Sequence, residues 1–351
     1  MRIALVGTEL APARAGAGAL ETLLDGWAAA LAAGGDEVHL VGAPGTAAGT
    51  DTAVARHELA HHPAGLDALV ARLAPDVVVL NNRPAWQALV RTATLHLMHN
   101  WPDAWQLGER PPAALVGQAS AAAVSGPLAA VVASALGRPG QGVAVVPPFA
   151  GDAFTQVEPD PQPGLILSPN RLLAKKGVRE LVAASRLPAL DGHQILVTDY
   201  LSPWRHATAE HDALRAVVTA APRCRLVPPP TTRPAMAALL ARASAVVVPS
   251  IRPEGFGMAA VEAQAVGVPV VTSGLGGLAE ATLPPSRVVD PHDPDALAAA
   301  IVAAAGVDRS ARLRLRDEAR RHWSAQRSVT ALRAALGAAS AGPPAGRISR
   351  R

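Results

Sequence analysis

A short, wholly apolar strand followed by a glycine-containing loop and a helix is the feature that most restricts how this chain can fold. The run Ala245–Val248 is closed by Pro249-Ser250, and the sequence PEGFGMAAVEAQAV then leads to a second apolar run, Pro269–Thr272. A continuous apolar run of this length is typical of a parallel strand that is covered on both faces. The segment therefore predicts an α/β fold with a parallel sheet.

The same alternation of strand and helix recurs in both halves of the chain, which favours doubly wound parallel sheets. In the first half we expect strands at Arg2–Val6, Glu37–Val41, Val77–Leu80, Thr92–Met98, Ala121–Val124 and Val143–Val146, and helices at Glu21–Ala33, Gly65–Leu73, Ala113–Gln118 and Leu128–Leu136. In the second half we expect strands at Gly164–Leu167, Gln194–Val197, Arg223–Val227, Ala245–Val248, Pro269–Thr272 and Arg287–Val289, and helices at Val178–Ser185 and from Ser310 through Leu336.

The length of the chain predicts two domains, because 351 residues exceed what one hydrophobic core usually supports. Prolines at 147–148 and between residues 158 and 164 mark a linker, since proline removes a backbone donor and restricts φ. We expect one domain over residues 1–158, a second over 159–324, a last helix at 325–340 that crosses back to the first domain, and a disordered tail at 341–351.

Composition argues against several classes of protein. The formal net charge is +4, the arginines are scattered and aromatic residues make up 3%, so no nucleic-acid partner is expected. The single cysteine, Cys224, cannot form an intramolecular disulfide and suits a core position in a reducing compartment. No apolar run approaches the ~20 residues of a transmembrane helix, and the N-terminal run is a strand rather than a signal peptide. We therefore expect a soluble, cytoplasmic protein.

Two glutamates in the PEGFGMAAVE segment are candidates for ligand binding. Gly255 and Gly257 allow the chain to turn sharply before a helix that begins near Gly257, where free backbone N–H groups favour an anionic ligand. Glu262 then lies about one and a half turns into the helix, and an ionised carboxylate there suits the vicinal diol of a ribose. The alternative is that Glu254 and Glu262 are surface residues without a function.

The two lysines of the chain are adjacent, at Lys175 and Lys176, among 32 basic residues. Arg171 stands just upstream, after the apolar run that ends at Leu167, and Gly177 follows. A guanidinium and an ammonium at one strand end would neutralise a diphosphate leaving group. The alternative is that both are ordinary solvated cations on a loop.

These motifs occur in an order that resembles the retaining glycosyltransferases of family 4, which have the GT-B fold. In the second half the resemblance rests on Arg171, Lys176-Gly177, Pro249-Ser250, Glu254 to Gly257, Glu262, Gly267 and Gly276-Gly277. In the first half it rests on Gly16, Gly18, His99-Asn100, Ser125 and the segment from Val145 to Phe154. The resemblance extends over nearly the whole chain and implies two Rossmann-like, doubly wound domains that face a central cleft.

The resemblance also implies roles for individual residues. Those implied in catalysis are Arg171, Lys176, His99 and Glu254. Those implied in donor binding are Gly16, Gly18, Gly255, Phe256, Gly257, Met258 and Glu262, and those expected on the acceptor side are Asn82, Arg83, Asn100 and Trp101.

The implied reaction moves a hexosyl-type sugar, with retention, from a nucleotide diphosphate sugar to an acceptor hydroxyl. A UDP-sugar is the commonest donor of the family, and the lack of a basic amphipathic patch favours a small soluble acceptor such as a specialised metabolite. No cofactor or metal is expected, because Arg171 and Lys176 supply the positive charge and Asp293 suits a helix cap. Three positions depart from the family pattern, namely Asn170, Thr198 and Pro148.

Three other functions compete with this interpretation. A nucleotide-sugar epimerase shares the two-domain plan, but the order of the motifs, above all the glutamate pair, fits a transferase better. A non-catalytic nucleotide-sugar-binding protein is a further alternative, which the formation of any glycosyl product would exclude. A nicotinamide-dependent dehydrogenase would place Gly-x-Gly-x-x-Gly directly after the first strand, whereas this chain has only Gly7 there. Among the histidines, His99 could instead be a structural residue, His96 is expected to be packed, and His57, His61 and His62 are expected in a surface loop without a metal.

Overall fold

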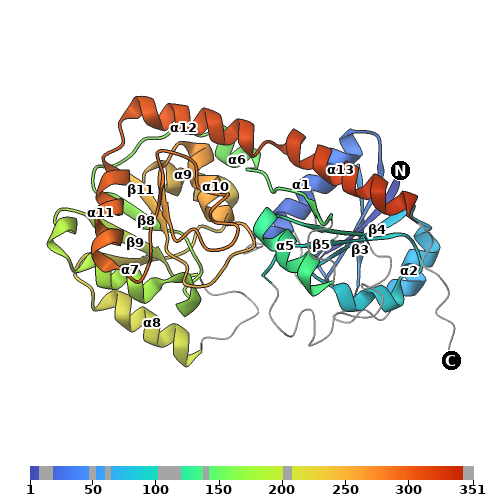
Figure 1. Ribbon diagram of the computed structural model, residues 1–351, viewed down its shortest axis with the longest axis horizontal. Coiled ribbons are helices and arrows are strands. Elements are labelled where there is room, and N and C mark those ends of the chain that lie inside the picture. The colour runs from blue at the N-terminus through green and yellow to red at the C-terminus, as the bar shows by residue number, and fades with distance from the viewer. Residues whose placement is uncertain are drawn as a thin grey trace. The chain divides into compact units, whose positions relative to one another are not determined.

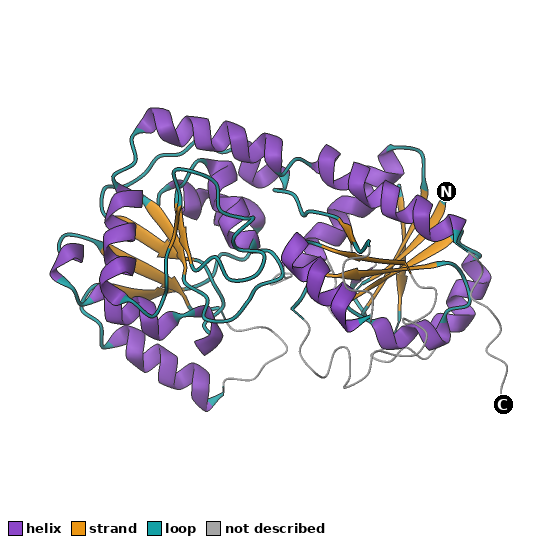
Figure 2. Ribbon diagram, in the orientation of Figure 1, coloured by secondary structure: helices purple, strands orange, loops and turns teal. Residues whose placement is uncertain are grey.

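The computed structural model describes residues 1–7, 19–46, 53–59, 65–101, 120–136, 142–200 and 208–342. The chain divides into two compact units, one formed by Met1–Phe149 with Ala325–Arg351 and the other by Ala150–Ser324. Each unit has a central parallel sheet with helices on both of its faces (Figure 2). The predicted α/β class and the doubly wound architecture are therefore confirmed.

The first unit contains a sheet of seven described strands in the order β3-β2-β1-β4-β5-β6-β7 (Figure 1). Its strands are β1 (Arg2–Val6), β2 (Glu37–Gly42), β3 (Val54–Glu58), β4 (Val77–Asn81), β5 (Thr94–Met98), β6 (Ser120–Ala123) and β7 (Ala144–Val145), and its helices are α1 (Ala19–Ala33), α2 (Leu66–Leu73), the 3₁₀ helix η2 (Pro84–Leu89), α5 (Gly126–Ala135) and α13 (Ala325–Ala341). All pairings are parallel. The strand order reverses between β1 and β4.

The second unit contains a sheet of six described strands in the order β10-β9-β8-β11-β12-β13, again wholly parallel. Its strands are β8 (Leu165–Ser168), β9 (Gln194–Thr198), β10 (Cys224–Val227), β11 (Ala245–Val248), β12 (Val270–Thr272) and β13 (Arg287–Val288). Its helices are α6 (Asp152–Thr155), α7 (Val178–Ser185), α8 (Ala209–Thr219), α9 (Arg233–Ala241), α10 (Met258–Val266), α11 (Pro294–Ala305) and α12 (Arg309–His322), with 3₁₀ turns η3 (Ala174–Lys176) and η4 (Pro188–Leu190). The strand order reverses between β8 and β11.

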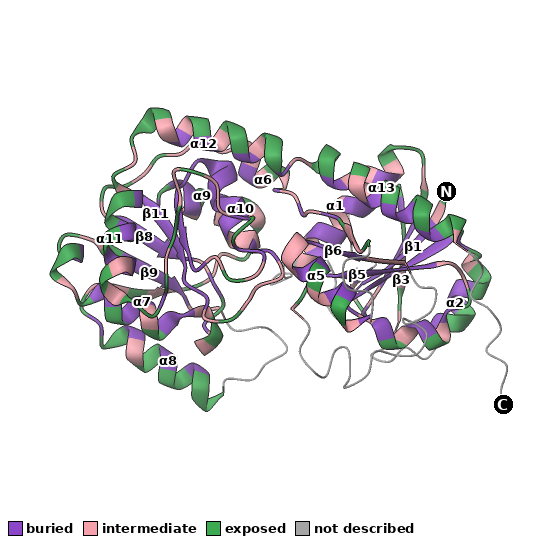
Figure 3. Cartoon of the chain, in the orientation of Figure 1, coloured by how far each residue is buried: buried purple, intermediate pink, exposed green. Residues whose placement is uncertain are grey.

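The central strands are buried on both faces, as their uninterrupted apolar sequences predict. All residues of β4, β5, β8 and β11 are buried (Figure 3), and those of β11 have no exposed surface. The core of the second unit combines Ile166 and Val247 from the sheet with Leu181 of α7 and Ile301 of α11. Helices α8 and α12 instead keep an exposed polar face.

The structure divides the chain between Phe149 and Ala150, earlier than the boundary at 158/159 that the sequence predicts. The segment after Phe149 packs on the second unit, because α6 contacts both α9 and α10. Asp160 N–H also donates to Ala241 O at 2.9 Å, and Arg320 donates to Val157 O at 3.1 Å. The proline-rich segment is therefore part of the second unit rather than a linker.

Two further predictions are wrong in detail. The helix expected from Ser310 through Leu336 is interrupted, since the carbonyl of Trp323 accepts from Ala150 N–H at 3.1 Å and Trp323 has non-helical dihedrals. His57 lies in strand β3, which was not predicted, and its Nε2 lies 3.1 Å from Nδ1 of His39 in β2. The predicted helix Ala113–Gln118 and His61 and His62 lie outside the described residues.

Other local predictions agree with the structure. Cys224 is partly buried against the core of the second unit, and His96 is buried with Nε2 2.8 Å from Gln87 Oε1. Asp293 accepts from Ala296 N–H at 2.9 Å and so caps α11. Among the helices that the structure describes, none combines the length and apolar character that crossing a bilayer requires.

Helix α13 packs on α1 and on β5 and β6 of the first unit, and a buried serine joins these elements. Ser328 Oγ accepts from Trp27 Nε1 at 2.7 Å and donates to Pro147 O at 2.6 Å, and both Ser328 and Trp27 are fully buried. This single hydroxyl therefore satisfies a donor on α1 and an acceptor on the segment after β7.

We predict that Ser328→Ala destabilises the protein by about 1–3 kcal/mol, because it leaves a buried indole N–H and a carbonyl without partners. Thr330→Ala is the matched control, since Thr330 is exposed on the same helix and bonds only locally to Gln326 O. The control should change stability by no more than about 0.5 kcal/mol. Urea unfolding of both variants measures the difference, and equal effects would contradict the role assigned to Ser328.

Candidate functional site

The candidate donor site is built from loops that follow β8 and β11, the two strands between which the strand order of the second unit reverses. Ligands of open α/β sheets bind beyond the carboxyl ends of the strands at such a reversal. Arg171 and Lys176 follow β8, and Glu254 follows β11. Because β8 and β11 pair directly, the topology brings these residues to one end of the sheet.

Lys176 and Glu254 form an ion pair, with Nζ 2.7 Å from Oε1, and both side chains are largely buried. Ser250 Oγ donates to the same carboxylate oxygen. Burial alone would raise the pKa of Glu254, but Lys176, Ser250 and Arg171 together outweigh it and hold that pKa below its ordinary value. Arg171, Lys176 and Glu254, which the sequence predicted as one site, thus interact in the structure.

The turn that carries Lys176 needs a glycine at position 177. Gly177 has a φ of 72°, and a Cβ there would lie 1.8 Å from Pro249 O at the end of β11. Ile251 N–H donates to Lys175 O at 3.0 Å across the same contact. The backbone after β11 therefore lies directly against the lysine turn, which sets the distance between Lys176 and Glu254.

A second close approach holds the other side of the Glu254 loop. Glu254 forms a parallel bridge with Gly276, whose φ is 64°, and a Cβ on Gly276 would lie 2.5 Å from Glu254 O. Gly277 N–H donates to that carbonyl at 2.8 Å. The loop then enters α10 at Met258, with Gly257 as its N-terminal cap and Phe256 buried. The predicted start of this helix is confirmed.

Arg171 is exposed, and its backbone bridges Tyr200 beyond the end of β9. Two of the departures from the family pattern form hydrogen bonds beside it. Thr198 Oγ1 donates to Asn170 O at 2.8 Å, and Asn170 Nδ2 donates to Val247 O at 3.3 Å. These two polar residues therefore join the ends of β8, β9 and β11.

Glu262 lies on α10 and is buried, with 5% of its surface exposed. Its Oε1 accepts a hydrogen bond from Arg233, the first residue of α9, in an ion pair. Burial raises the pKa of Glu262, and Arg233 opposes that shift. Arg233 was not predicted from the sequence, because it lies 29 residues from Glu262 in a segment without a recognisable motif.

In the first unit, His99 is held by two consecutive asparagines at the carboxyl end of β4. Asn81 Nδ2 donates to Val6 O at 2.9 Å, and its Oδ1 lies 2.8 Å from His99 Nε2. Because an amide oxygen can only accept a hydrogen bond, the imidazole ring donates from Nε2–H. Asn82, with a φ of 53°, accepts from His99 N–H at 2.8 Å. Burial lowers the pKa of His99 to about 3, so the ring is neutral at physiological pH.

The remaining predicted residues are less constrained. The guanidinium of Arg83 lies 5.3 Å from the ring centroid of Trp86, Asn100 is exposed and Trp101 is partly exposed. Ser125 caps α5 by accepting from Leu128 N–H at 3.3 Å. Gly16 and Gly18 lie outside the described residues.

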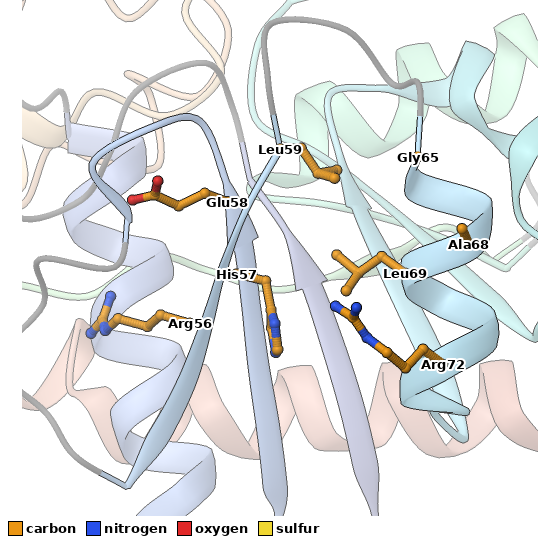
Figure 4. Close-up of a pocket in the computed structure, with 8 residues that line it drawn as sticks. All are labelled: Arg56, His57, Glu58, Leu59, Gly65, Ala68, Leu69 and Arg72. Atoms are coloured by element: carbon orange, nitrogen blue, oxygen red, sulfur yellow. The ribbon is translucent and has the colours of Figure 1, made fainter.

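A cavity of about 380 Å³ lies elsewhere in the first unit, between β3 and α2 (Figure 4). Leu69 and Arg72 extend from α2 toward His57 on β3. None of the predicted site residues lines this cavity. It is therefore separate from the candidate donor site.

Each unit contains a parallel α/β sheet, and the second unit has cations and carboxylates where its strand order reverses. These features place the chain in the class of proteins with the GT-B glycosyltransferase fold. Residues 171–306 match the family described as glycosyl transferases group 1, and this range includes all predicted site residues of the second unit. The resemblance stated from the motifs is therefore confirmed for this part of the chain.

Individual relatives and solved structures are also similar to this chain. A segment of 166 residues is 33% identical to a D-inositol 3-phosphate glycosyltransferase of Thermomonospora curvata and covers 45% of this chain. The match spans about a third (36%) of that curated relative's length. Two solved structures each have a TM-score of 0.72. The first is AviGT4, a glycosyltransferase involved in avilamycin A biosynthesis, which is 21% identical over 97% of this chain and 98% of its own. The second is Anabaena Alr3699/HepE in complex with UDP-glucose, which is 15% identical over 96% of this chain and 100% of its own. At these identities the structures show the fold alone.

We predict that Gly177→Ala is more damaging than Gly192→Ala. Both glycines have positive φ, 72° and 80°, but a Cβ on Gly192 would meet nothing within 4 Å. The control variant should cost about 1–2 kcal/mol from left-handed backbone strain alone. Gly177→Ala adds the clash with Pro249 O, and unfolding free energies measure the excess. Equal losses in both variants would show that the close approach is unimportant.

We also predict that the stability due to the Lys176–Glu254 pair depends on pH. A carboxyl whose folded pKa is lowered stabilises the protein above its ordinary value of 4.5, and this stability disappears as the pH falls through the folded pKa. Lys176→Met should therefore cost roughly 3 kcal/mol at neutral pH and progressively less in acid. Thermal unfolding from neutral to acidic pH tests this, with Lys175→Met as the exposed control. A pH-independent difference would contradict it.

Proposed function

We propose that this protein is a retaining glycosyltransferase that moves a hexosyl-type sugar from a uridine diphosphate sugar to a hydroxyl of a small, soluble acceptor. The observation that carries the proposal is the Lys176–Glu254 pair with Arg171 acting on the same carboxylate, at the strand reversal of the second unit. Two cations at this end of the sheet suit a diphosphate, which a buried carboxylate alone would repel.

The donor would be bound by residues of the second unit. Arg171 and Lys176 neutralise the diphosphate, and the backbone N–H groups from Gly255 to Met258 at the start of α10 add partial positive charge. Glu254, whose Oε1 contacts Lys176, would accept from hexose hydroxyls. Glu262 would accept from the ribose hydroxyls. The structurally similar Anabaena protein forms a complex with UDP-glucose, which supports a uridine diphosphate donor.

The reaction proposed is a front-face displacement. The bond between the anomeric carbon and the diphosphate oxygen breaks, the acceptor oxygen bonds to that carbon on the same face, and the acceptor proton passes to the departing diphosphate. Arg171 and Lys176 stabilise the negative charge that develops on the leaving group. Glu254 and Glu262 both have cationic partners, so neither is assigned as a covalent nucleophile.

The acceptor would contact the first unit, where Asn82, Arg83, Asn100 and Trp101 follow β4 and β5. His99 would offer a ring near the donor sugar that burial keeps neutral and that the hydrogen bond to Asn81 orients. The structural similarity to AviGT4, which is involved in avilamycin A biosynthesis, supports a specialised metabolite as acceptor. We further propose that no metal is needed, since the two cations supply the positive charge, and that the protein acts in the cytoplasm.

We predict that Lys176→Ala lowers turnover by about 10²–10³-fold, because it removes the point charge that stabilises the leaving diphosphate. Lys175→Ala is the matched control, since this exposed neighbour is not among the groups that lower the pKa of Glu254, and it should retain activity within a few-fold. UDP release from UDP-glucose, with a panel of acceptor alcohols and a chelator present, gives the rates. Mass spectrometry of the products identifies the transferred sugar.

Three results would contradict the proposed function. Equal rates for Lys176→Ala and wild type would remove the assigned role of the lysine. Conversion of a UDP-sugar to its epimer by the protein with donor alone would favour an epimerase instead. The complete lack of any glycosyl product over the panel would favour a binding protein.

A further inference from the structure

Arg233 makes two contacts within the second unit, one of them with the predicted donor-binding residue Glu262. Its guanidinium donates to Glu262 Oε1, and it also lies 4.6 Å from the ring centroid of Phe154 on α6. Phe154 is almost fully buried. The ring fixes one face of the guanidinium while the carboxylate accepts from its edge, so the orientation of Arg233 is constrained on two sides.

The carboxylate of Glu262 depends on this partner for its charge. Burial of an isolated carboxylate favours the protonated form, and only an opposing cation or hydrogen-bond donors can offset that effect. Arg233 is the one charged group among the described residues that lowers the pKa of Glu262. Without it, burial would act unopposed.

The elements packed against α10 contribute no competing charge to this carboxylate. The pairing strands β11 and β12 contain no charged residues. Helices α6, α9 and α12 also pack against α10, and among their charged groups only Arg233 shifts the pKa of Glu262. Several of the others have partners elsewhere: Arg242, which ends α9, bonds Gln162, and on α12 Arg312 bonds Ser244 O, Arg314 bonds Ser310, Arg316 bonds Glu158 and Asp317, and Arg320 bonds Ala265 O.

The ion pair uses only one oxygen of the carboxylate. Arg233 contacts Oε1, and no hydrogen bond from the described residues reaches Oε2. A carboxylate held by one oxygen can present the other to a diol in a single orientation. An arginine fork that is itself packed against a ring is suited to hold that orientation.

We propose that Arg233 is a positioning residue for nucleotide recognition: it holds Glu262 by Oε1 so that Oε2 accepts from the ribose hydroxyls. This inference rests on the proposed function, because it takes the ribose as the ligand of Glu262. It assigns to the start of α9 a role in distinguishing ribose from deoxyribose. Arg233 acts through Glu262 and does not itself contact the reacting atoms.

The test compares the binding of UDP and 2′-deoxy-UDP to the whole protein by calorimetry over a range of pH. Wild type should bind UDP about 10–100-fold more tightly, the value of a hydrogen bond to a charged group. In Arg233→Met this preference should fall to a few-fold at neutral pH and recover only in part as the pH rises, because Glu262 then ionises but is no longer held by Oε1. Arg233→Lys should retain part of it, and Arg242→Met, an exposed arginine at the end of the same helix, should match wild type.

If Arg233 had a purely structural role, its loss would weaken the binding of UDP and of 2′-deoxy-UDP equally and leave the ratio of their affinities unchanged. That result in Arg233→Met overturns the inference while the proposed function stands. The double variant Arg233→Met/Glu262→Gln should show no further loss of preference beyond Glu262→Gln alone, and independent losses would also overturn it. If wild type binds UDP with no preference over the deoxy form, the ribose contact itself fails, and the proposed donor assignment of Glu262 falls with it.

Discussion

The ion pair between Lys176 and Glu254 is the interaction on which the rest of the candidate site depends. It joins the loop after β8 to the loop after β11, and these strands lie side by side where the order of the sheet reverses. A doubly wound sheet leaves a crevice only at such a reversal, because elsewhere consecutive crossovers cover the strand ends. The topology thus places the two loops side by side, and the ion pair brings a cation and a carboxylate together between them.

Backbone contact, rather than side-chain contact, sets the spacing of these loops. Gly177 rests against Pro249, and Gly276 rests against the backbone of Glu254, at separations that leave no room for a Cβ. Both glycines also have positive φ, so an L-residue at either position would combine backbone strain with a clash. The Glu254 loop is therefore held from both sides, and its carboxylate can be buried with a defined partner.

Much of the fold could be predicted from the sequence, because a strand buried on both faces is a continuous apolar run. The ends of β1 and β11 agree with the prediction to the residue. Strand β3 was missed because its sequence, VARHE, is largely polar, as suits the edge strand that it is. The break at Trp323 was missed because a helix can end on a single tertiary hydrogen bond, here from Ala150, without a glycine or proline to mark it.

In the candidate site, the sequence indicated the residues with a motif but not their partners. Arg171, Lys176 and Glu254 could be grouped because each follows a strand end, whereas Arg233 and Asn81 act through contacts between residues far apart in the chain. The two carboxylates illustrate the consequence. Each side chain is largely buried and each pairs with a cation through Oε1, yet the pKa of Glu254 is lowered and that of Glu262 is raised. Glu254 has Ser250 and Arg171 in addition to Lys176, while Glu262 has Arg233 alone. The number of groups that oppose burial therefore decides the direction in which each pKa shifts, and these groups can be identified only in the folded structure.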